Sequence, residues 1–236
     1  MNLVLNPRLQ GVEKFVTGGK IFADVGTDHA YLPTYLLLNR IIPYAYASDI
    51  RKGPLESARR TVESYGVADK TGLILCDGLD LVPDDAEEIA IAGMGGIMIA
   101  DIVARTTWLR NKQKHLILQP MTKISYLRKQ LYKNGFEIEK EEVICDGPKV
   151  YVVMSVYYSG KTVEIDELFS YIGKTLNASG DKRRYLIKQV KKLDRIAYGL
   201  IESGEEENKE KANELLKLRN QIGDILEGKD AGKRDL

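Results

Sequence analysis

FADVGTDHAYLP, residues 22–33, joins a short apolar run to a group of polar side chains. The run has the length and composition of a buried strand, and it ends at an acid and a glycine. Glycine lets another group approach the backbone, and the polar residues that follow are typical of the start of a helix. In open α/β sheets, ligands bind beyond the carboxyl ends of the strands. The stretch therefore predicts a first strand with a ligand site at its end; the alternative is an ordinary strand-to-helix turn.

Short apolar runs recur along the first two thirds of the chain, each followed by glycine, acid or proline, and they predict buried strands. Amphipathic stretches lie between them, such as residues 54–65 and residues 123–134, and predict helices. This alternation favours a mostly parallel sheet with helices on both faces. A final pair of runs is separated by a short turn, so the sheet should end with an antiparallel strand. The predicted strands are 20–25, 43–48, 72–76, 88–92, 115–119, 136–144 and 150–158.

Beyond Gly160 the apolar residues step by three and four, which predicts a pair of antiparallel helices, preceded by a third helix over roughly residues 165–178. We therefore expect two domains, residues 1–160 and residues 161–236. A hairpin that packs on itself and an arm that docks on a partner are equally open. The seam positions are Leu186, Val190, Leu193, Ala197 and Leu200 in one helix and Ala212, Leu215, Arg219, Ile222 and Leu226 in the other.

Composition excludes some classes of protein. The 236 residues are 44% hydrophobic, enough for one sizeable core and an appendage. No apolar run approaches the ~20 residues that span a bilayer, and the N-terminus lacks the apolar segment of a signal peptide, so we expect a cytoplasmic protein without membrane contact. Cys76 and Cys145 have no partner at metal-ligand spacing, which predicts two buried thiols and no metal site. The oligomeric state does not follow from the sequence.

Charge is segregated in the last third of the chain, although the formal net charge is only +1. Six glutamates face two lysines between Glu202 and Glu214, whereas residues 182–195 are strongly basic with Asp194 as their one acid. A local patch of this kind matters more for a nucleic-acid partner than the net charge does. The basic residues of this stretch are Lys182, Arg183, Arg184, Lys188, Lys191, Lys192 and Arg195.

Acids end three successive predicted strands, at Asp24, Asp49 and Asp77. A carboxylate such as Asp49, more than 20 residues beyond the first glycine loop, is placed to accept both hydroxyls of a ribose. Asp77, which precedes Gly78, can accept from the exocyclic amine of an adenine. The three acids together favour an adenosine-type ligand.

The choice of cofactor depends on motifs that are missing. The first loop reads DVGTDHA rather than G-x-G-x-x-G, and no G-x-x-x-x-G-K-[ST] occurs, so NAD and nucleoside triphosphates are disfavoured. S-adenosylmethionine carries no phosphate. It needs a ribose acceptor, an adenine pocket and groups for its amino-acid end, where Asp24 would pair with the ammonium.

The stretches DVGTDHAYLP, ASDIRKGPLESA, CDGLD, IAGMGG and LILQPM, in this order and spacing, closely resemble the bacterial tRNA (adenine-22, N1)-methyltransferase family, TrmK. The resemblance runs from about Pro7 to Tyr158, and the helical tail is similar to that family's coiled-coil appendage. It implies a Rossmann-like class I methyltransferase fold with a seven-stranded, mostly parallel sheet, S-adenosylmethionine as the donor and tRNA as the acceptor. Val25 and Ser48 depart from the family pattern but leave the acids intact.

With this resemblance, the motifs predict a donor site, a catalytic site and a substrate site. The expected donor-binding residues are Asp24, Gly26, Thr27, Asp49, Ile50, Asp77, Gly78, Gly93 and Met94. The expected catalytic residues are Asp28, His29 and Gly93. The expected substrate-binding residues are Arg8, Arg51, Gly95, Gly96, Gln119 and Pro120.

The chemistry needs no strong base, because adenine N1 has an in-plane lone pair at neutral pH and can attack the sulfonium methyl directly. The product ring is cationic, and Asp28 is our candidate for stabilising the developing charge. His29 would hydrogen-bond the substrate or orient Asp28, or else it faces solvent or caps a helix. The loop Gly93–Gly96 offers bare backbone and room for a ring edge; a close helix-to-strand crossing is the alternative.

The resulting interpretation is a tRNA adenine-N1 methyltransferase. A methyltransferase that acts on a small molecule or a protein would share the donor site, and a non-catalytic RNA-binding module would share the fold. The intact acids at three strand ends disfavour the module. Further expected RNA contacts are Lys52, Arg59, Arg60 and the basic stretch 182–195.

Overall fold

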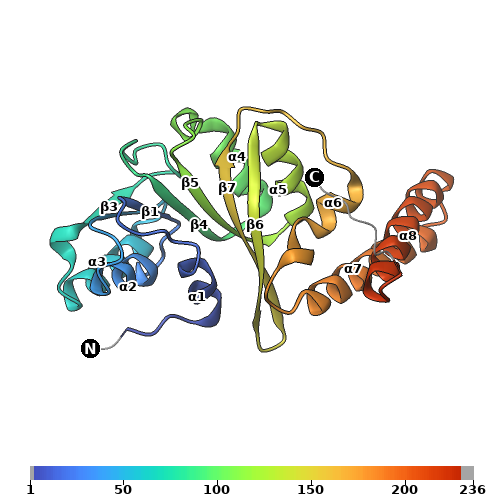
Figure 1. Ribbon diagram of the computed structural model, residues 1–236, viewed down its shortest axis with the longest axis horizontal. Coiled ribbons are helices and arrows are strands. Elements are labelled where there is room, and N and C mark those ends of the chain that lie inside the picture. The colour runs from blue at the N-terminus through green and yellow to red at the C-terminus, as the bar shows by residue number, and fades with distance from the viewer. Residues whose placement is uncertain (1–2, 230–236) are drawn as a thin grey trace.

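Seven strands form one sheet in the computed structural model of the protein, which describes residues 3–229. Their order is β3-β2-β1-β4-β5-β7-β6 (Figure 1), and β7 alone runs antiparallel to its neighbours. The seven-stranded, mostly parallel sheet is confirmed. The strands are β1 Phe22–Val25, β2 Ala45–Asp49, β3 Thr71–Leu75, β4 Glu88–Gly95, β5 His115–Thr122, β6 Phe136–Asp146 and β7 Lys149–Tyr158.

The antiparallel strand was predicted at the end of the sheet, and this part of the prediction is wrong. β7 inserts between β5 and β6, so that β6 forms the edge. The two-residue turn after β6 makes β7 pair directly with β6. The long connection between β5 and β6 leaves room for one strand between them, and β7 fills it.

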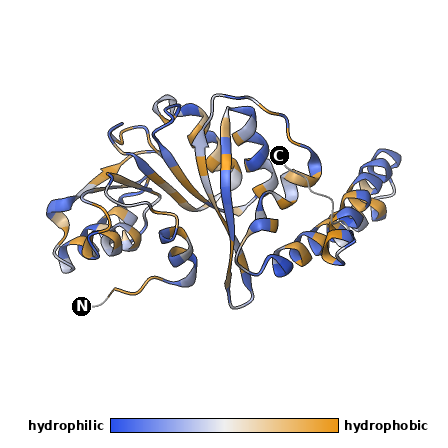
Figure 2. Ribbon diagram, in the orientation of Figure 1, coloured by the Kyte–Doolittle hydropathy of each residue, from blue (hydrophilic) through white to orange (hydrophobic). Residues whose placement is uncertain are grey.

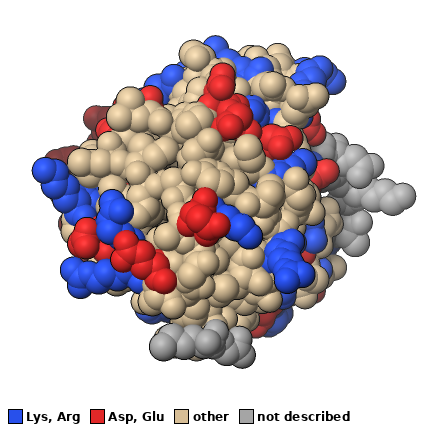
Figure 3. All heavy atoms as spheres, turned by 90° about the vertical axis from the view of Figure 1, so that its left-hand side faces the viewer, with Lys and Arg blue, Asp and Glu red and all other residues tan. Residues whose placement is uncertain are grey.

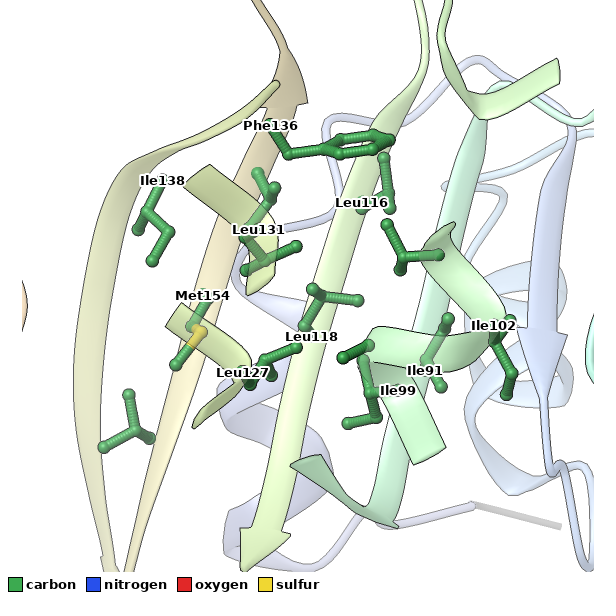
Figure 4. Packing of buried hydrophobic residues seen from close by; sticks show 14 of the residues in the cluster. Ile91, Ile99, Ile102, Leu116, Leu118, Leu127, Leu131, Phe136, Ile138 and Met154 are labelled. Atoms are coloured by element: carbon green, nitrogen blue, oxygen red, sulfur yellow. The ribbon is translucent and has the colours of Figure 1, made fainter. Parts of the chain in front are cut away.

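Helices cover both faces of the sheet because strand side chains alternate between two apolar cores. Phe22 packs with α1, α2 and α3, whereas Ala23 and Val25 belong to the core under α4 and α5. Figure 4 shows Ile99 and Leu127 of the second set of helices pointing toward strand residues. No helix within residues 3–229 is long and apolar enough to cross a membrane. The helices are α1 Pro7–Glu13, α2 Tyr31–Leu38, α3 Lys52–Ser64, α4 Gly96–Arg105, α5 Ile124–Lys133, α6 Glu167–Ile172, α7 Lys182–Glu202 and α8 Glu206–Leu226.

His115 and Cys145 lie away from the strand ends that carry the acids. His115 is buried at the start of β5, where its ring contacts Glu88 and Ser155 at 2.9 Å each, so its role is structural. Cys76 is buried as predicted, but Cys145 is only half-buried. Cys145 lies near the β6–β7 turn, where the sheet projects beyond its covering helices (Figure 1).

α7 and α8 form a helical hairpin at one end of the molecule (Figure 1), with apolar residues between them and polar residues outside (Figure 2). The expected seam holds at Leu193, Ala212 and Ile222, which are buried. Arg219 instead lies at the edge of the seam and pairs with Asp194 at 2.9 Å, while Leu218 takes the buried position. The third predicted helix is shorter than expected, since α6 ends before Gly173, whose φ is +55°.

A buried ion pair joins the helical region to the sheet. Arg128 of α5 is completely buried, and its Nε donates to Glu141 of β6 at 2.9 Å. Its Nη1 donates to the carbonyls of Ser170 and Tyr171 in α6, and also to the hydroxyl of Tyr185 in α7. One guanidinium therefore connects four elements of the chain.

Candidate functional site

The loop after β1 holds an unusual backbone. Gly26, Asp28 and Ala30 have φ values of 72°, 51° and 53°, in the left-handed region. Glycine and aspartate enter this region more readily than alanine does. Two non-glycine residues in this conformation within three positions indicate a loop whose shape is set by its surroundings, as in many ligand sites.

Asp24, the acid that precedes this loop, is 7% exposed. Thr27 Oγ1 donates to its Oδ2 at 2.6 Å, so Thr27 orients the carboxylate. Burial raises the pKa of Asp24 to about 6, although the Thr27 hydrogen bond and the positive charge of Arg8 oppose the rise. A cationic ligand group would favour the ionised form further.

Gly26 makes room for a side chain of the protein. A Cβ at Gly26 would lie 2.2 Å from Met94 Cε, so the methionine of the second glycine loop packs against the first loop. The backbone N–H of Gly26 donates to the carbonyl of Ser48 in β2 at 2.8 Å. The ends of β1, β2 and β4 are thereby held together.

Asp49 ends β2 and is 7% exposed. Its Oδ1 accepts a hydrogen bond from the backbone N–H of Arg51 at 2.8 Å, which fixes the carboxylate in place. Within the described residues, Oδ2 has no hydrogen-bond partner. Asp49 is therefore a preoriented acceptor at the wall of a cleft.

Asp77, beyond β3, is held by Arg105 at the end of α4. Arg105 Nη2 donates to Asp77 Oδ1 at 2.8 Å and to the Asp77 carbonyl at 3.1 Å. The hydrogen bond from Arg105 holds the pKa of Asp77 below its ordinary value. Arg105 was not predicted as part of the site, because its partner Asp77 lies 28 residues away in the sequence.

Gln119 lies beneath the glycine loop that follows β4. Its Oε1 accepts from Gly93 N at 3.1 Å and from Arg8 Nη1 at 2.8 Å, and the side chain is fully buried. Gly96 begins α4 against the next strand, since a Cβ there would lie 2.7 Å from the carbonyl oxygen of Thr122. Gly96 thus fits the close-crossing alternative, and Gln119 supports the loop from below.

Two neighbouring cavities border these loops, one of about 1170 Å³ and one of about 190 Å³. Arg8, Gly26, Asp28 and Ala92 border both and form the partition between them. Of the predicted residues, the larger cavity is lined by Arg8, Gly26, Asp28, Asp49, Ile50, Arg51, Asp77, Gly78, Gly93, Met94 and Gly95. The smaller cavity adds Asp24, Thr27 and His29. Neither cavity is lined by Gly96, Gln119 or Pro120.

Several wall residues were not predicted. Ile97 and Met98 of α4, and Tyr126 and Gln130 of α5, line the larger cavity. Ile97 and Met98 directly follow a glycine-rich loop, and this pattern could have indicated their place in the wall. The second pair lies on a helix that looked merely amphipathic.

The residues fit the parts of S-adenosylmethionine. Asp49 is an acceptor-only group for ribose hydroxyls, and Asp77 is one for an exocyclic amine. Asp24 and Arg8 border the same small cavity with opposite charges, which suits a zwitterionic amino-acid end. Within residues 3–229, no cluster of three or more His, Cys, Asp or Glu side chains is arranged to hold a metal ion.

Comparisons with known proteins identify the family of the chain. A profile of the family described as methyltransferase domain matches residues 5–154. The curated tRNA (adenine(22)-N(1))-methyltransferase of Bacillus subtilis is 37% identical over 153 residues, which make up 64% of this chain and 64% of that protein. The alignment therefore spans just under two thirds of that relative's length.

Solved structures match over nearly the whole chain. A Streptococcus pneumoniae protein, proposed to be a tRNA (m1A22) methyltransferase, is 30% identical with a TM-score of 0.81, covering 94% of this chain and 100% of its own. Its complex with S-adenosyl-L-methionine gives a TM-score of 0.80 at 29% identity over 94% and 100% of the two chains. The Bacillus subtilis tRNA methyltransferase TrmK gives 0.79 at 29% identity over 95% and 100%. The chain belongs to the methyltransferase-domain family and, within it, to the tRNA (adenine-22, N1)-methyltransferase family, TrmK.

Proposed function

We propose that this protein transfers a methyl group from S-adenosylmethionine to N1 of adenine 22 in tRNA. The observation that carries the proposal is the meeting of Asp24, Asp49 and Asp77 around two adjoining cavities, in a chain of this family. Since the substrate is tRNA, we propose the cytoplasm as its compartment.

The donor-binding roles follow from the geometry of the strand ends. Asp49 accepts the ribose hydroxyls with a carboxylate already fixed by Arg51. Asp77, held by Arg105, receives the adenine amine. Asp24 and Arg8 take the ammonium and the carboxylate of the donor. When bound, the donor supplies an electrophilic methyl group on a sulfonium.

The acceptor base enters the larger cavity from the side of Gly95, Met98 and Tyr126. The cavity of about 1170 Å³ exceeds the roughly 300–1,000 Å³ typical of a pocket for one small ligand, so it has room for the donor and a second ring. An adenine that is stacked or paired in tRNA must first turn out, at a cost of a few kcal/mol. Gly93 and Gly95, which line this cavity without side chains, let the ring edge approach the backbone.

Asp28 is the carboxylate best placed to stabilise the methylated ring. It borders both cavities, and its side chain is 65% exposed, so a ligand can reach it. His29 Nε2 lies 3.7 Å from Asp28 Oδ2, and the His29 ring stacks on Tyr31. The histidine lies beside the aspartate, and alignment of the reacting atoms supplies the remaining rate enhancement.

Nucleoside mass spectrometry tests the proposal. Unmodified tRNA is incubated with the protein and S-adenosylmethionine, and a tRNA with guanine at position 22 serves as the control. We expect 1-methyladenosine only in the adenine-22 tRNA. Methyl transfer without RNA would favour a small-molecule or protein substrate, and an absence of transfer despite tRNA binding would favour the non-catalytic RNA-binding module.

A further inference from the structure

Four cations gather where the helical hairpin meets the catalytic sheet. Lys188, Lys192 and Arg195 follow one face of α7 at i, i+4 and i+7, a span of roughly 10 Å. Lys123, at the junction of β5 and α5, is the fourth. Burial lowers the pKa of Lys192, and the positive charges of Lys123, Arg195 and Lys188 lower it further. The four side chains are here called the junction cluster, and Lys192 Nζ also lies 5.5 Å from the centre of the Tyr171 ring in α6, the helix that packs beside α5.

Within the described residues, no carboxylate forms an ion pair with any member of the junction cluster. Lys188 donates one hydrogen bond to the Val150 carbonyl, and its ammonium keeps two donors. Other basic residues of α7 are used inside the protein: Lys182, Arg183 and Arg184 donate to backbone carbonyls. The side chains of Lys123 and Arg195 have no hydrogen bond within the described residues, so the junction cluster keeps free donors, and an anion would relieve the repulsion among its charges.

The position of Lys123 relative to the active-site loop is fixed. Its φ is +53°, and its carbonyl oxygen lies 2.6 Å from the position that a Cβ on Gly96 would take, so its backbone packs tightly on the start of α4. Tyr126, three residues further on, lines the larger cavity and is 41% exposed. Met98 and Met121 are also exposed. An apolar, aromatic rim of the cavity therefore lies close to Lys123.

The opposite end of the molecule carries mixed charges instead. Figure 3 shows basic and acidic side chains interspersed over the end formed by α2, α3 and β3. Arg59 and Arg60 were predicted from the sequence to contact RNA. Both form ion pairs with Glu56, within 4 Å. Charge complementarity to a polyanion is therefore stronger at the junction cluster.

We propose that the junction cluster binds successive phosphates of the RNA strand next to the target adenine, and that Tyr126 stacks on an unpaired base of this strand. This inference rests on the proposed function. Cations spread over roughly 10 Å can contact more than one phosphate of a strand. Cations beside an exposed aromatic ring are the combination that binds single-stranded nucleic acid without reading its sequence.

Charge reversal tests the cluster in the full-length protein. Lys123→Glu, Lys192→Glu and Arg195→Glu should each weaken tRNA affinity at least tenfold and flatten its dependence on salt. Lys112→Glu, at an exposed position before β5 and so at the opposite end of that strand from Lys123, is the control and should change affinity less than threefold. Because Lys192 is half-buried, unchanged affinity for S-adenosylmethionine and an unchanged melting temperature are required of every variant. Arg195, which is exposed, is the substitute where Lys192→Glu fails this requirement.

Aromatic substitution tests the stacking partner. Tyr126→Phe should bind tRNA like the parent, whereas Tyr126→Ala should weaken binding roughly tenfold. Equal affinity of the two variants would overturn the stacking role, and cluster variants that bind like Lys112→Glu would overturn the phosphate role. The proposed function has a separate test. It is overturned if the parent protein leaves adenine 22 unmethylated, whatever the tRNA affinities of the variants are.

Discussion

Our proposal for Asp24 predicts that donor binding is sensitive to pH in an ordinary buffer range. Its pKa is raised to about 6 by burial, so the ammonium of the donor meets a carboxylate at pH 7.5 and a neutral acid at pH 5. We expect the affinity for S-adenosylmethionine to fall about tenfold for each pH unit below 6. Calorimetry at several pH values measures this affinity, and Asp24→Asn should make the affinity independent of pH in this range. An affinity that is constant from pH 7.5 to 5 would exclude Asp24 from the ammonium site.

The same carboxylate lowers the stability of the free protein. Its pKa is higher in the folded state than the ordinary 3.8, so the protonated form stabilises the fold below about pH 3.8. This contribution is lost as pH rises through about 6, and it amounts to roughly 3 kcal/mol. Asp24→Asn should therefore raise the free energy of unfolding at pH 7.5 while it weakens donor binding. Urea denaturation without donor measures the change in the free energy of unfolding, and calorimetry measures the change in donor affinity.

Asp28 belongs to the chemical step in our proposal. Asp28→Asn removes the charge and keeps the shape, and asparagine tolerates the φ of 51° at this position. Single-turnover methyl transfer should slow by about a hundredfold, comparable to the loss of one preorganised electrostatic contact. Donor affinity should hardly change, because the lost interaction grows only in the transition state. A parental rate, or a parallel loss of donor affinity, would assign Asp28 to the donor pocket.

The strands and most helices could be predicted from the sequence because their patterns are local. The apolar runs and their glycine or acid ends mark β1 to β5, and the acids at Asp24, Asp49 and Asp77 follow directly. Contacts between segments that are distant in the sequence could not be predicted from local patterns. The insertion of β7, the Arg105 contact to Asp77 and the place of Gln119 under the glycine loop all depend on residues brought together by folding.

The ion pair between Arg128 and Glu141 is an element-scale contact of this long-range kind. Glu141→Gln leaves a buried guanidinium without its counter-charge, so the free energy of unfolding should fall by roughly 3–5 kcal/mol. Urea denaturation measures the change. Lys129→Ala is the control: Lys129 lies on the same helix as Arg128 and forms an exposed ion pair with Glu167 of α6, so the substitution should cost less than about 1 kcal/mol. A loss for Glu141→Gln as small as the control's would show that the pair does not hold the elements together.

At the scale of the whole molecule, one apolar core runs from the sheet into the helical tail. The cluster under α4 and α5 also contains Leu168, Leu186, Leu193 and Ile222. The tail therefore shares its apolar core with the catalytic region. This shared core holds the α7 members of the junction cluster in place relative to that region. Division of the chain at residue 160 into two domains remains a prediction that stability can test.

A chain that ends at Gly160 provides this test. It loses the carbonyls of Ser170 and Tyr171 and the hydroxyl of Tyr185, which satisfy Arg128 in the full chain. It also exposes the apolar residues of β6, β7 and α5 that α6 and α7 cover. We expect the shortened chain to unfold several kcal/mol more easily than the full chain, as measured by urea denaturation.

Replacing the buried pair of Arg128 and Glu141 with apolar residues should restore part of the stability of the shortened chain. Arg128→Leu combined with Glu141→Leu removes both buried charges, and apolar substitutes for a buried ion pair are often neutral or stabilising. The double variant should therefore be more stable than the shortened parent, yet still less stable than the full chain because the covering helices are gone. If the shortened parent is instead as stable as the full chain, residues 1–160 fold alone, and the tail is an appended domain whose contacts with Arg128 contribute little.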